Sequence, residues 1–395
     1  MSVSVSQQPQ AYTPGYSSQW FTALSTQIAQ PNFFYTVICT DIISGDTQTY
    51  QLPQRPDGYC VFDAGPFAEN LLTQYAPINV YGWKLATGIR KIRVNIGETY
   101  GSTPAYASGT NIDYIVWNAI TDFKDFPGFT YTDFVFNNLT ANEVYLTNLL
   151  NENTYEDRSN YFYALTSQVG DLLNIQIETY DSQGTTIGSS YIENPYEAST
   201  DYREKYLCID IGHKGLKNIH FSLVTGIFPI ITDAVASYRV FIGTEIKLMA
   251  IACEPRYDVY TIHYLRKNGA FETINFSKRS DTSKDKTTTS YKKQPYVLTS
   301  GQYAYNAHDA VERVLSTLTT DKLKLNTDWL TEEEVELHAD LMDAPIVYLD
   351  LGKDVDFLQL KVVTNSYKLN KRYNERMFSL SMDFEYTHQN ARQRC

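Results

Sequence analysis

Apolar and polar residues alternate along several short stretches of the chain, which is the pattern of strands with one buried face. The longest is 378–386, where Phe, Leu, Met, Phe and Tyr alternate with Ser, Ser, Asp and Glu. Residues 92–96 and 173–179 show the same period of two. Between residues 33 and 65, short apolar runs are separated by turn-forming residues at the spacing of sandwiches and barrels. The pattern predicts a mainly β protein.

Two segments carry the helix-start signal known as a capping box. Thr331 precedes Glu334 by three residues, which predicts a short helix near 332–342. The same spacing at 140–143 predicts a second short helix over residues 144–150. We therefore expect multi-module β-sandwich and β-barrel-like domains with a few short helices.

The chain has 395 residues, which is more than one hydrophobic core usually organises. The first 31 residues are rich in Ser, Gln, Tyr and Pro and lack a buriable period, so we expect an extended arm there. The expected parts are an arm at 1–31, a β-sandwich-like module at 32–110, a second β module at 111–204, a third at 205–300 with a basic loop at 278–293, and a barrel-like module at 301–395.

The net charge of −12 makes the chain as a whole repel phosphate, so contact with DNA is expected to be transient and non-specific. No apolar run of about 18 residues could span a membrane. Residues 1–19 lack the features of a secretory signal, and the five cysteines are odd in number and widely spaced. We expect a soluble protein made in the cytoplasm, with reduced cysteines.

No strong catalytic motif is present, and neither a cofactor nor a metal is expected. The six histidines are scattered, and Cys208 with His213 and His220 has no zinc-like spacing. Asp350, Asp354 and Asp356 suggest a solvated hairpin turn rather than a calcium loop. Because 45 acidic residues are present, a catalytic carboxylate pair cannot be recognised from spacing alone, and that alternative stays open.

Two segments are candidate assembly interfaces. The run 278–293 holds six Lys or Arg residues among Ser and Thr, and it is interpreted as a flexible loop that reaches a neighbouring subunit. The N-terminal arm offers aromatic side chains, which combine apolar area with a polar group. The candidate interface residues are Tyr12, Tyr16, Trp20, Phe21, Lys284, Lys286, Tyr291, Lys292 and Lys293.

Residues 260–293, YTIHYLRKNGAFETINFSKRSDTSKDKTTTSYKK, resemble a segment of tail proteins from phages that infect Bacteroidetes hosts, including crAss-like phages. Residues 323–394 are similar to the C-terminal module of the same proteins. Residues 89–106 and 158–184 also resemble their N-terminal modules, so the likeness covers most of residues 33–394. The resemblance implies a virion structural role in a tail ring or tail hub, beneath the portal and adaptor, and it brings no catalytic residues.

We therefore expect a non-enzymatic phage tail protein that forms a homo-oligomeric ring, contacts other tail or portal and adaptor proteins and encloses the DNA channel. One alternative is a carbohydrate-binding or glycan-degrading β-sandwich, which would need an exposed platform from Trp20, Trp83, Trp117 and Trp329. Trp329 precedes a helix cap and is expected in the core. The other alternative is a host-binding fibre or adhesin, but neither long repeats nor a coiled-coil pattern is present.

Overall fold

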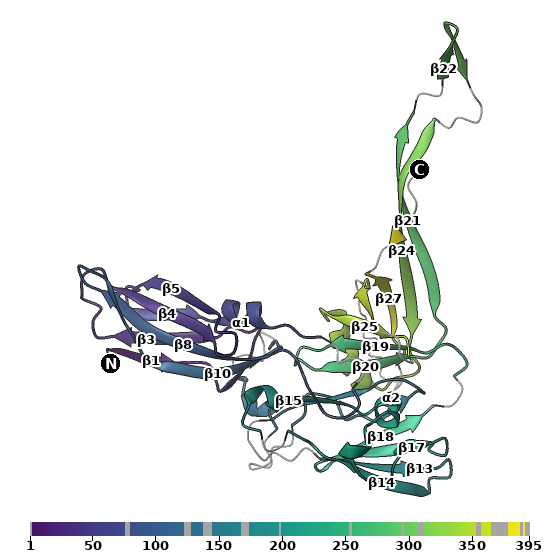
Figure 1. The fold of residues 1–395 in the computed structure, drawn as a ribbon, viewed down its shortest axis with the longest axis horizontal. Helices are drawn as coiled ribbons and strands as arrows, with labels where there is room; N and C mark the ends of the chain where they lie inside the picture. The colour runs from purple at the N-terminus through teal and green to yellow at the C-terminus, as the bar shows by residue number, and fades with distance from the viewer. Residues whose placement is uncertain are drawn as a thin grey trace. The chain divides into compact units, whose positions relative to one another are not determined.

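The computed structural model describes residues 2–75, 80–121, 128–136, 144–166, 174–196, 199–252, 255–293, 296–305, 311–352, 357–364, 378–387 and 390–391. These residues form mostly strands with a few short helices, so the expected mainly β fold class is confirmed. The chain divides into two compact units (Figure 1). Unit 1 holds Met1–Cys253, His263–Thr273 and Gly352–Asp354, and unit 2 holds Glu254–Ile262, Ile274–Leu351 and Val355–Cys395.

The first core of unit 1 lies between two sheets. The three-stranded sheet has the order β1 (Val3–Gln7), β3 (Trp20–Ser25), β6 (Tyr59–Asp63). The six-stranded sheet has the order β2 (Tyr12–Pro14), β10 (Asn111–Trp117), β8 (Ile89–Tyr100), β4 (Phe34–Asp41), β5 (Thr47–Pro53), with β9 (Ala105–Ala107) beside β8. Alternate side chains of β8, Ile92, Val94 and Ile96, are buried, as their period of two predicts. The helix α1 (Gly65–Leu71) adds Phe67 to this core.

The expected N-terminal arm is wrong, because residues 3–25 supply three strands of this sandwich, β1, β2 and β3. Val3, Phe21 and Ala23 belong to the first core, and β3 pairs with both β1 and β6. The inward positions of β3 are Phe21, Ala23 and Ser25, so two small residues hide the period of two. A strand of this composition gives a weak sequence signal although it is fully integrated.

The second core of unit 1 is also formed by two sheets. The six-stranded sheet has the order β11 (Glu152–Thr154), β18 (Glu245–Ile251), β17 (Ser237–Ile242), β13 (Ile175–Tyr180), β14 (Thr186–Ile192), β16 (Val224–Gly226). The three-stranded sheet has the order β12 (Tyr161–Leu165), β15 (Tyr206–Asp210), β7 (Lys84–Leu85). The short helices nearby in the chain are η2 (Tyr131–Asp133), η4 (Tyr202–Lys205), α2 (His213–Lys217) and η5 (Phe221–Leu223).

Unit 2 is built on an eight-stranded sheet, although His263–Thr273, which holds the end of its second strand, the start of its first and the turn between them, counts with unit 1. Its order is β20 (Phe271–Phe276), β19 (Tyr260–Leu265), β25 (Val347–Asp350), β26 (Leu358–Val362), β27 (Ser381–Tyr386), β24 (Glu312–Asn326), β21 (Asp281–Lys292), with β28 (Asn390–Ala391) beside β24. A separate hairpin joins β22 (Tyr296–Thr299) and β23 (Gln302–Tyr305).

Two sequence predictions in unit 2 are confirmed. In β27 the side chains of Met382 and Phe384 are buried while Ser381 and Asp383 are exposed. The helix α3 (Glu332–Leu337), continued by η6 (His338–Met342), opens with the full capping box between Thr331 and Glu334.

The helix expected over residues 144–150 is wrong, because this segment is described and contains no helix. Two contacts hold it in a loop instead: Leu146 N donates to Tyr163 O at 3.2 Å, and Leu150 N donates to Asn148 Oδ1 at 2.6 Å. Tertiary pairing therefore overrides the local helix signal. The capping residues 140–143 lie outside the described residues.

Two other expectations concern turns and boundaries. Asp350 is the last residue of β25 and is buried, so the solvated position expected for it is wrong. The strand β26 pairs antiparallel with β25, and Asp354 and Asp356 lie outside the described residues. The module boundaries expected near residues 110 and 204 fall within unit 1, and the boundary near 300 falls within unit 2. The division of these units into the smaller expected modules stays a prediction.

Candidate functional site

The longest exposed feature of unit 2 is a two-stranded ribbon made by β21 and β24 (Figure 1). The strands pair antiparallel from Asp281 opposite Lys324 to Lys292 opposite Glu312. All twelve side chains of β21 are exposed. We call the part formed by residues 286–293 and 311–319 the distal ribbon. The strand β24 also pairs with β27 through residues 322–326 and with β28 through Leu318 and Thr319. Among the described strands, the end of the ribbon from Glu312 to Thr317 therefore has no third strand beside it, and a two-stranded ribbon is only marginally stable in water.

The segment 278–293 is thus a strand, and the flexible loop expected there is wrong. The sequence lacks apolar alternation because neither face of β21 is buried, which removed the usual strand signal. Three consecutive β-branched residues, Thr287–Thr289, favour an extended backbone. Antiparallel pairing with β24 completes the backbone hydrogen bonds on one side of the strand.

Ion pairs between neighbouring strands hold the rest of the ribbon, residues 281–285 and 320–324, in register. Lys284 Nζ lies 3.3 Å from Asp321 Oδ1, directly across the ladder. Lys322 Nζ lies 2.6 Å from Asp285 Oδ2 and 3.1 Å from Glu385 Oε1 on β27. Hydrogen bonds to these carboxylates raise the pKa of Lys322. Each pair is at least partly exposed to solvent, so its main effect is on register rather than on stability.

The distal ribbon has a different surface. Tyr291, Val314, Leu315 and Leu318 are all exposed there, with Leu315 53% exposed. Leu315 sits opposite a register shift between Thr289 and Ser290, which is the geometry of a β-bulge. Apolar side chains on a ribbon without a core beneath them mark a surface for association.

The sequence-derived interface residues fall into two groups. Lys284, Lys286, Tyr291 and Lys292 lie on β21, and Lys293 follows it, with its backbone N donating to Val311 O at 2.8 Å. Tyr12, Tyr16, Trp20 and Phe21 lie in unit 1, where Tyr16 and Trp20 are exposed but Tyr12 and Phe21 are buried.

The assignment of Tyr12 and Phe21 to an exposed interface is therefore wrong. Tyr12 stacks on Tyr131 and its hydroxyl donates to Thr166 O at 3.2 Å. Phe21 packs against Tyr114 in the first core, with ring centroids 5.9 Å apart. Both aromatics stabilise the fold of unit 1.

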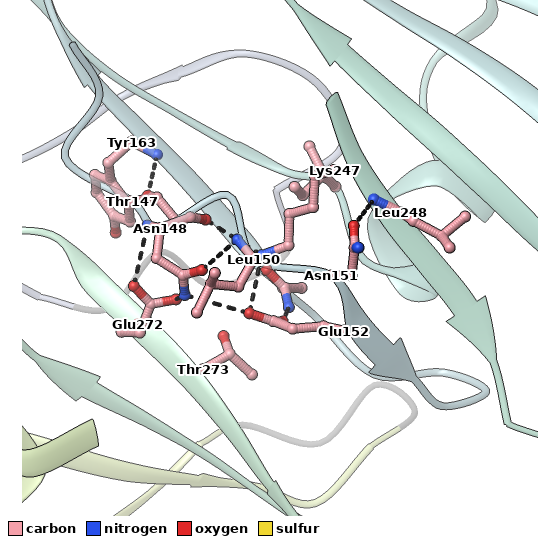
Figure 2. Close-up of polar contacts among 12 residues, drawn as sticks. Thr147, Asn148, Leu150, Asn151, Glu152, Tyr163, Lys247, Leu248, Glu272 and Thr273 are labelled. Atoms are coloured by element: carbon pink, nitrogen blue, oxygen red, sulfur yellow. Dashed lines mark hydrogen bonds and ion pairs between the residues drawn. The ribbon is translucent and has the colours of Figure 1, made fainter. Parts of the chain in front are cut away.

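A buried charge cluster in unit 1, formed by Lys247, Glu152, Glu272, Asn148 and Arg266, is the other notable polar site (Figure 2). Lys247 is fully buried, and its Nζ lies 3.0 Å from Glu152 Oε1 and 3.4 Å from Asn148 O. Asn148 Nδ2 donates to Glu272 Oε1 at 3.0 Å. Arg266 Nη1 lies 3.6 Å from Glu272 Oε2. The cluster thus ties the loop before β11 to β18 and to the turn between β19 and β20.

Burial raises the pKa of Glu272 to about 7, with Lys247 opposing the shift and Glu152 adding to it. A carboxyl with a raised pKa beside a second carboxylate is also a feature of glycosidase sites. Here, however, Glu272 is fully buried and its oxygens contact Asn148 and Arg266. We interpret the cluster as a structural element of unit 1. Sequence reasoning missed it, although Lys247 stands at an inward position of β18 beside Met249, which is an unusual place for a charge.

Other candidate chemistry can be located in the described part of the chain. No group of three or more His, Cys, Asp or Glu side chains there is placed to hold a metal ion. Cys39, Cys60 and Cys208 are free and buried, and burial raises the pKa of Cys39 and Cys208 to about 12. These thiols are therefore poor nucleophiles. None of the helices described is long and apolar enough to cross a membrane.

The tryptophans do not form the arrangement that a glycan platform requires. Trp83 and Trp117 are buried in unit 1, and Trp117 Nε1 donates to Asn268 O at 2.9 Å. Trp329 is 61% exposed, so its expected place in the core is wrong. Leu330, the next residue, pairs through its backbone with Phe378 and is partly buried, whereas the Trp329 indole stays exposed.

Comparison with known proteins adds little. No protein-family model and no curated protein matches the chain. Among solved structures, the FN1–FN3 domains of chicken CNTN1 align with 8% identity and a TM-score of 0.17. The alignment covers 62% of this chain and 62% of that structure.

Proposed function

We propose that this chain is a structural subunit of a phage tail, which forms a homo-oligomeric ring around the DNA channel and links neighbouring tail, portal or adaptor proteins. The observation that carries the proposal is the β21–β24 ribbon, whose twelve β21 side chains are all exposed. A long ribbon without its own core is stabilised best when another protein covers it. The resemblance of residues 260–293 to phage tail proteins supports the same role.

The charge of the chain fits this role. A lumen lined by an acidic protein lets DNA pass without adhering, because each phosphate contact would add affinity. The protein would be made in the host cytoplasm and act in the virion, and its role requires no catalysis, cofactor or metal.

The test is assembly of the purified chain and its presence in virions. We expect mass measurement and negative-stain imaging to show closed rings or their fragments, and labelled antibodies to bind at one level of the tail. A chain that stays monomeric at high concentration and is absent from virions would refute the proposal. A defined glycan cleavage lost on substitution of Glu272 or Glu152 would favour the carboxylate alternative instead.

A further inference from the structure

A second exposed apolar surface lies in unit 1, at the edge of its second core. We call Phe221, Ile227 and Phe228 the edge patch. They are 67%, 50% and 41% exposed and flank β16, the last strand of the six-stranded sheet. The rings of Phe221 and Phe228 contact each other with centroids 5.5 Å apart. Three large apolar side chains together on an exposed edge indicate a binding surface.

The edge patch is held in place by the sheet. Ile227 N donates to Ser189 O at 3.3 Å, and Ser190 Oγ donates to Ile227 O at 2.5 Å. A Cβ at Gly188 would lie 2.5 Å from Ile227 Cδ1, so glycine is needed for Ile227 to pack there. The patch is therefore presented in a fixed conformation, which lowers the entropic cost of binding.

The charges of the chain favour the distal ribbon as the occupant of this patch. The distal ribbon carries four basic residues, Lys286, Lys292, Lys293 and Arg313, and one acidic residue, Glu312, and subtracting this +3 from the chain's −12 leaves −15 elsewhere. Lys286 and Lys292 are exposed and make no ion pair among the described residues. At the patch, exposed Glu193 accepts from Thr225 Oγ1 at 3.1 Å and offers negative charge.

Pairing of β21 with β21 of a second copy is disfavoured. Lys284, Lys286 and Lys292 stand at even positions and share one face of the strand. A two-fold strand pair would bring these lysines together on one face, and like charges there are destabilising. Lysines on an edge strand generally prevent such pairing. The distal ribbon therefore fits a surface other than its own, one that offers a carboxylate.

We infer that the edge patch of one copy binds the distal ribbon of the next copy, a step that rests on the proposed ring-forming function. Val314, with Leu315 beside it at the bulge, would cover Phe221, Ile227 and Phe228. Lys286 and Lys292, which lie on the same face of the ribbon as Val314, would approach Glu193. Two different surfaces on one chain make a heterologous contact, which repeats head to tail until a ring closes.

The experiment uses two full-length variants that each disable one surface. Phe221→Asp disrupts the edge patch, and Lys286→Glu with Lys292→Glu reverses the distal ribbon's charge. All three side chains are exposed, so folding should be retained. Tyr75→Asp, at a side chain 66% exposed in unit 1, is the matched control. Mass would be measured by light scattering and sedimentation for each variant alone and for an equimolar mixture.

We expect each variant alone to associate about tenfold more weakly or worse, and the control to assemble like the parent. The mixture should form a dimer and nothing larger. The Phe221→Asp variant still has an intact distal ribbon and the lysine variant still has an intact edge patch, so one such contact can form, and no further contact can follow it. Monomers in the mixture, or normal assembly of either variant, would overturn the inference. If the parent assembles and both variants assemble as strongly as the parent, only the inference fails. If the parent is a monomer, the proposed function fails as well.

Discussion

Replacing Glu272 with Gln should make unit 1 more stable at pH 8 while leaving it nearly unchanged at pH 4.5. Glu272 is fully buried in the charge cluster, and desolvation raises its pKa from 4.5 to about 7. In the folded protein the carboxyl therefore holds its proton at pH values where the unfolded chain has already lost it. Because the folded-state pKa is the higher one, the stabilisation is complete below about pH 4.5 and is lost as pH rises to about 7.

The magnitude follows from the size of the shift. A change of one pKa unit corresponds to about 1.4 kcal/mol, so the shift of Glu272 is worth up to roughly 3 kcal/mol across this window. Gln keeps the shape of the protonated acid and can still accept from Asn148 N, which contacts Glu272 Oε2 at 3.4 Å. The variant should lack this part of the pH dependence and gain roughly 1–3 kcal/mol at pH 8.

The assay is denaturant unfolding at several pH values between 4.5 and 8, followed by fluorescence of the buried Trp83 and Trp117 in unit 1. Glu193→Gln, at an exposed side chain, controls for the loss of one charge. The reasoning is refuted if Glu272→Gln loses stability between pH 4.5 and 7 as steeply as the parent. Destabilisation of the variant at pH 8 would show instead that ionised Glu272 is needed to pair with Arg266.

Three further predictions concern folding. Phe384→Asp should cost several kcal/mol and give insoluble protein, whereas Ser381→Asp should stay within about 0.5 kcal/mol of the parent; equal tolerance in melting temperature would contradict the facing of β27. Deleting residues 2–31 should abolish the cooperative melting of unit 1, and Phe21→Ala alone should lower its stability by about 3–5 kcal/mol. A truncated chain that melts normally would contradict the placement of β1 and β3 in the first core. Thr331→Ala should lower stability by about 1 kcal/mol through loss of the capping box, and no change in urea unfolding of unit 2 would argue that the cap is dispensable.

The parts of the fold that the sequence predicted are those where local pattern and burial agree. In β13 the side chains of Ile175 and Ile177 are buried, and in β27 those of Met382 and Phe384 are buried, so alternation marked both strands. The capping box at Thr331 is a purely local contact and was equally visible. These elements need no knowledge of distant partners.

The wrong predictions concern two kinds of segment. One kind takes its structure from contacts with residues distant in the sequence, and the other has no buried face at all. Phe21 was interpreted as an interface residue because its inward neighbours Ala23 and Ser25 are small, and only β6 and β10 explain its burial. The strand β21 escaped prediction because both of its faces are exposed, which makes a strand look like a polar loop. Its lysines were nevertheless identified as candidates, since charge is visible without structure.

The buried charge cluster shows why polar residues inside unit 1 matter more for specificity than for stability. The strand β11 has only three residues and pairs in parallel with β18, with Glu152 opposite Met249. Apolar packing alone would leave such a short strand free to slip, and a slip of one residue would turn Glu152 to the other face. Lys247 would then be buried without its carboxylate, at a cost of several kcal/mol. The ion pair between Lys247 and Glu152 therefore selects one register of β11, and this register fixes the loop whose Asn148 binds Glu272.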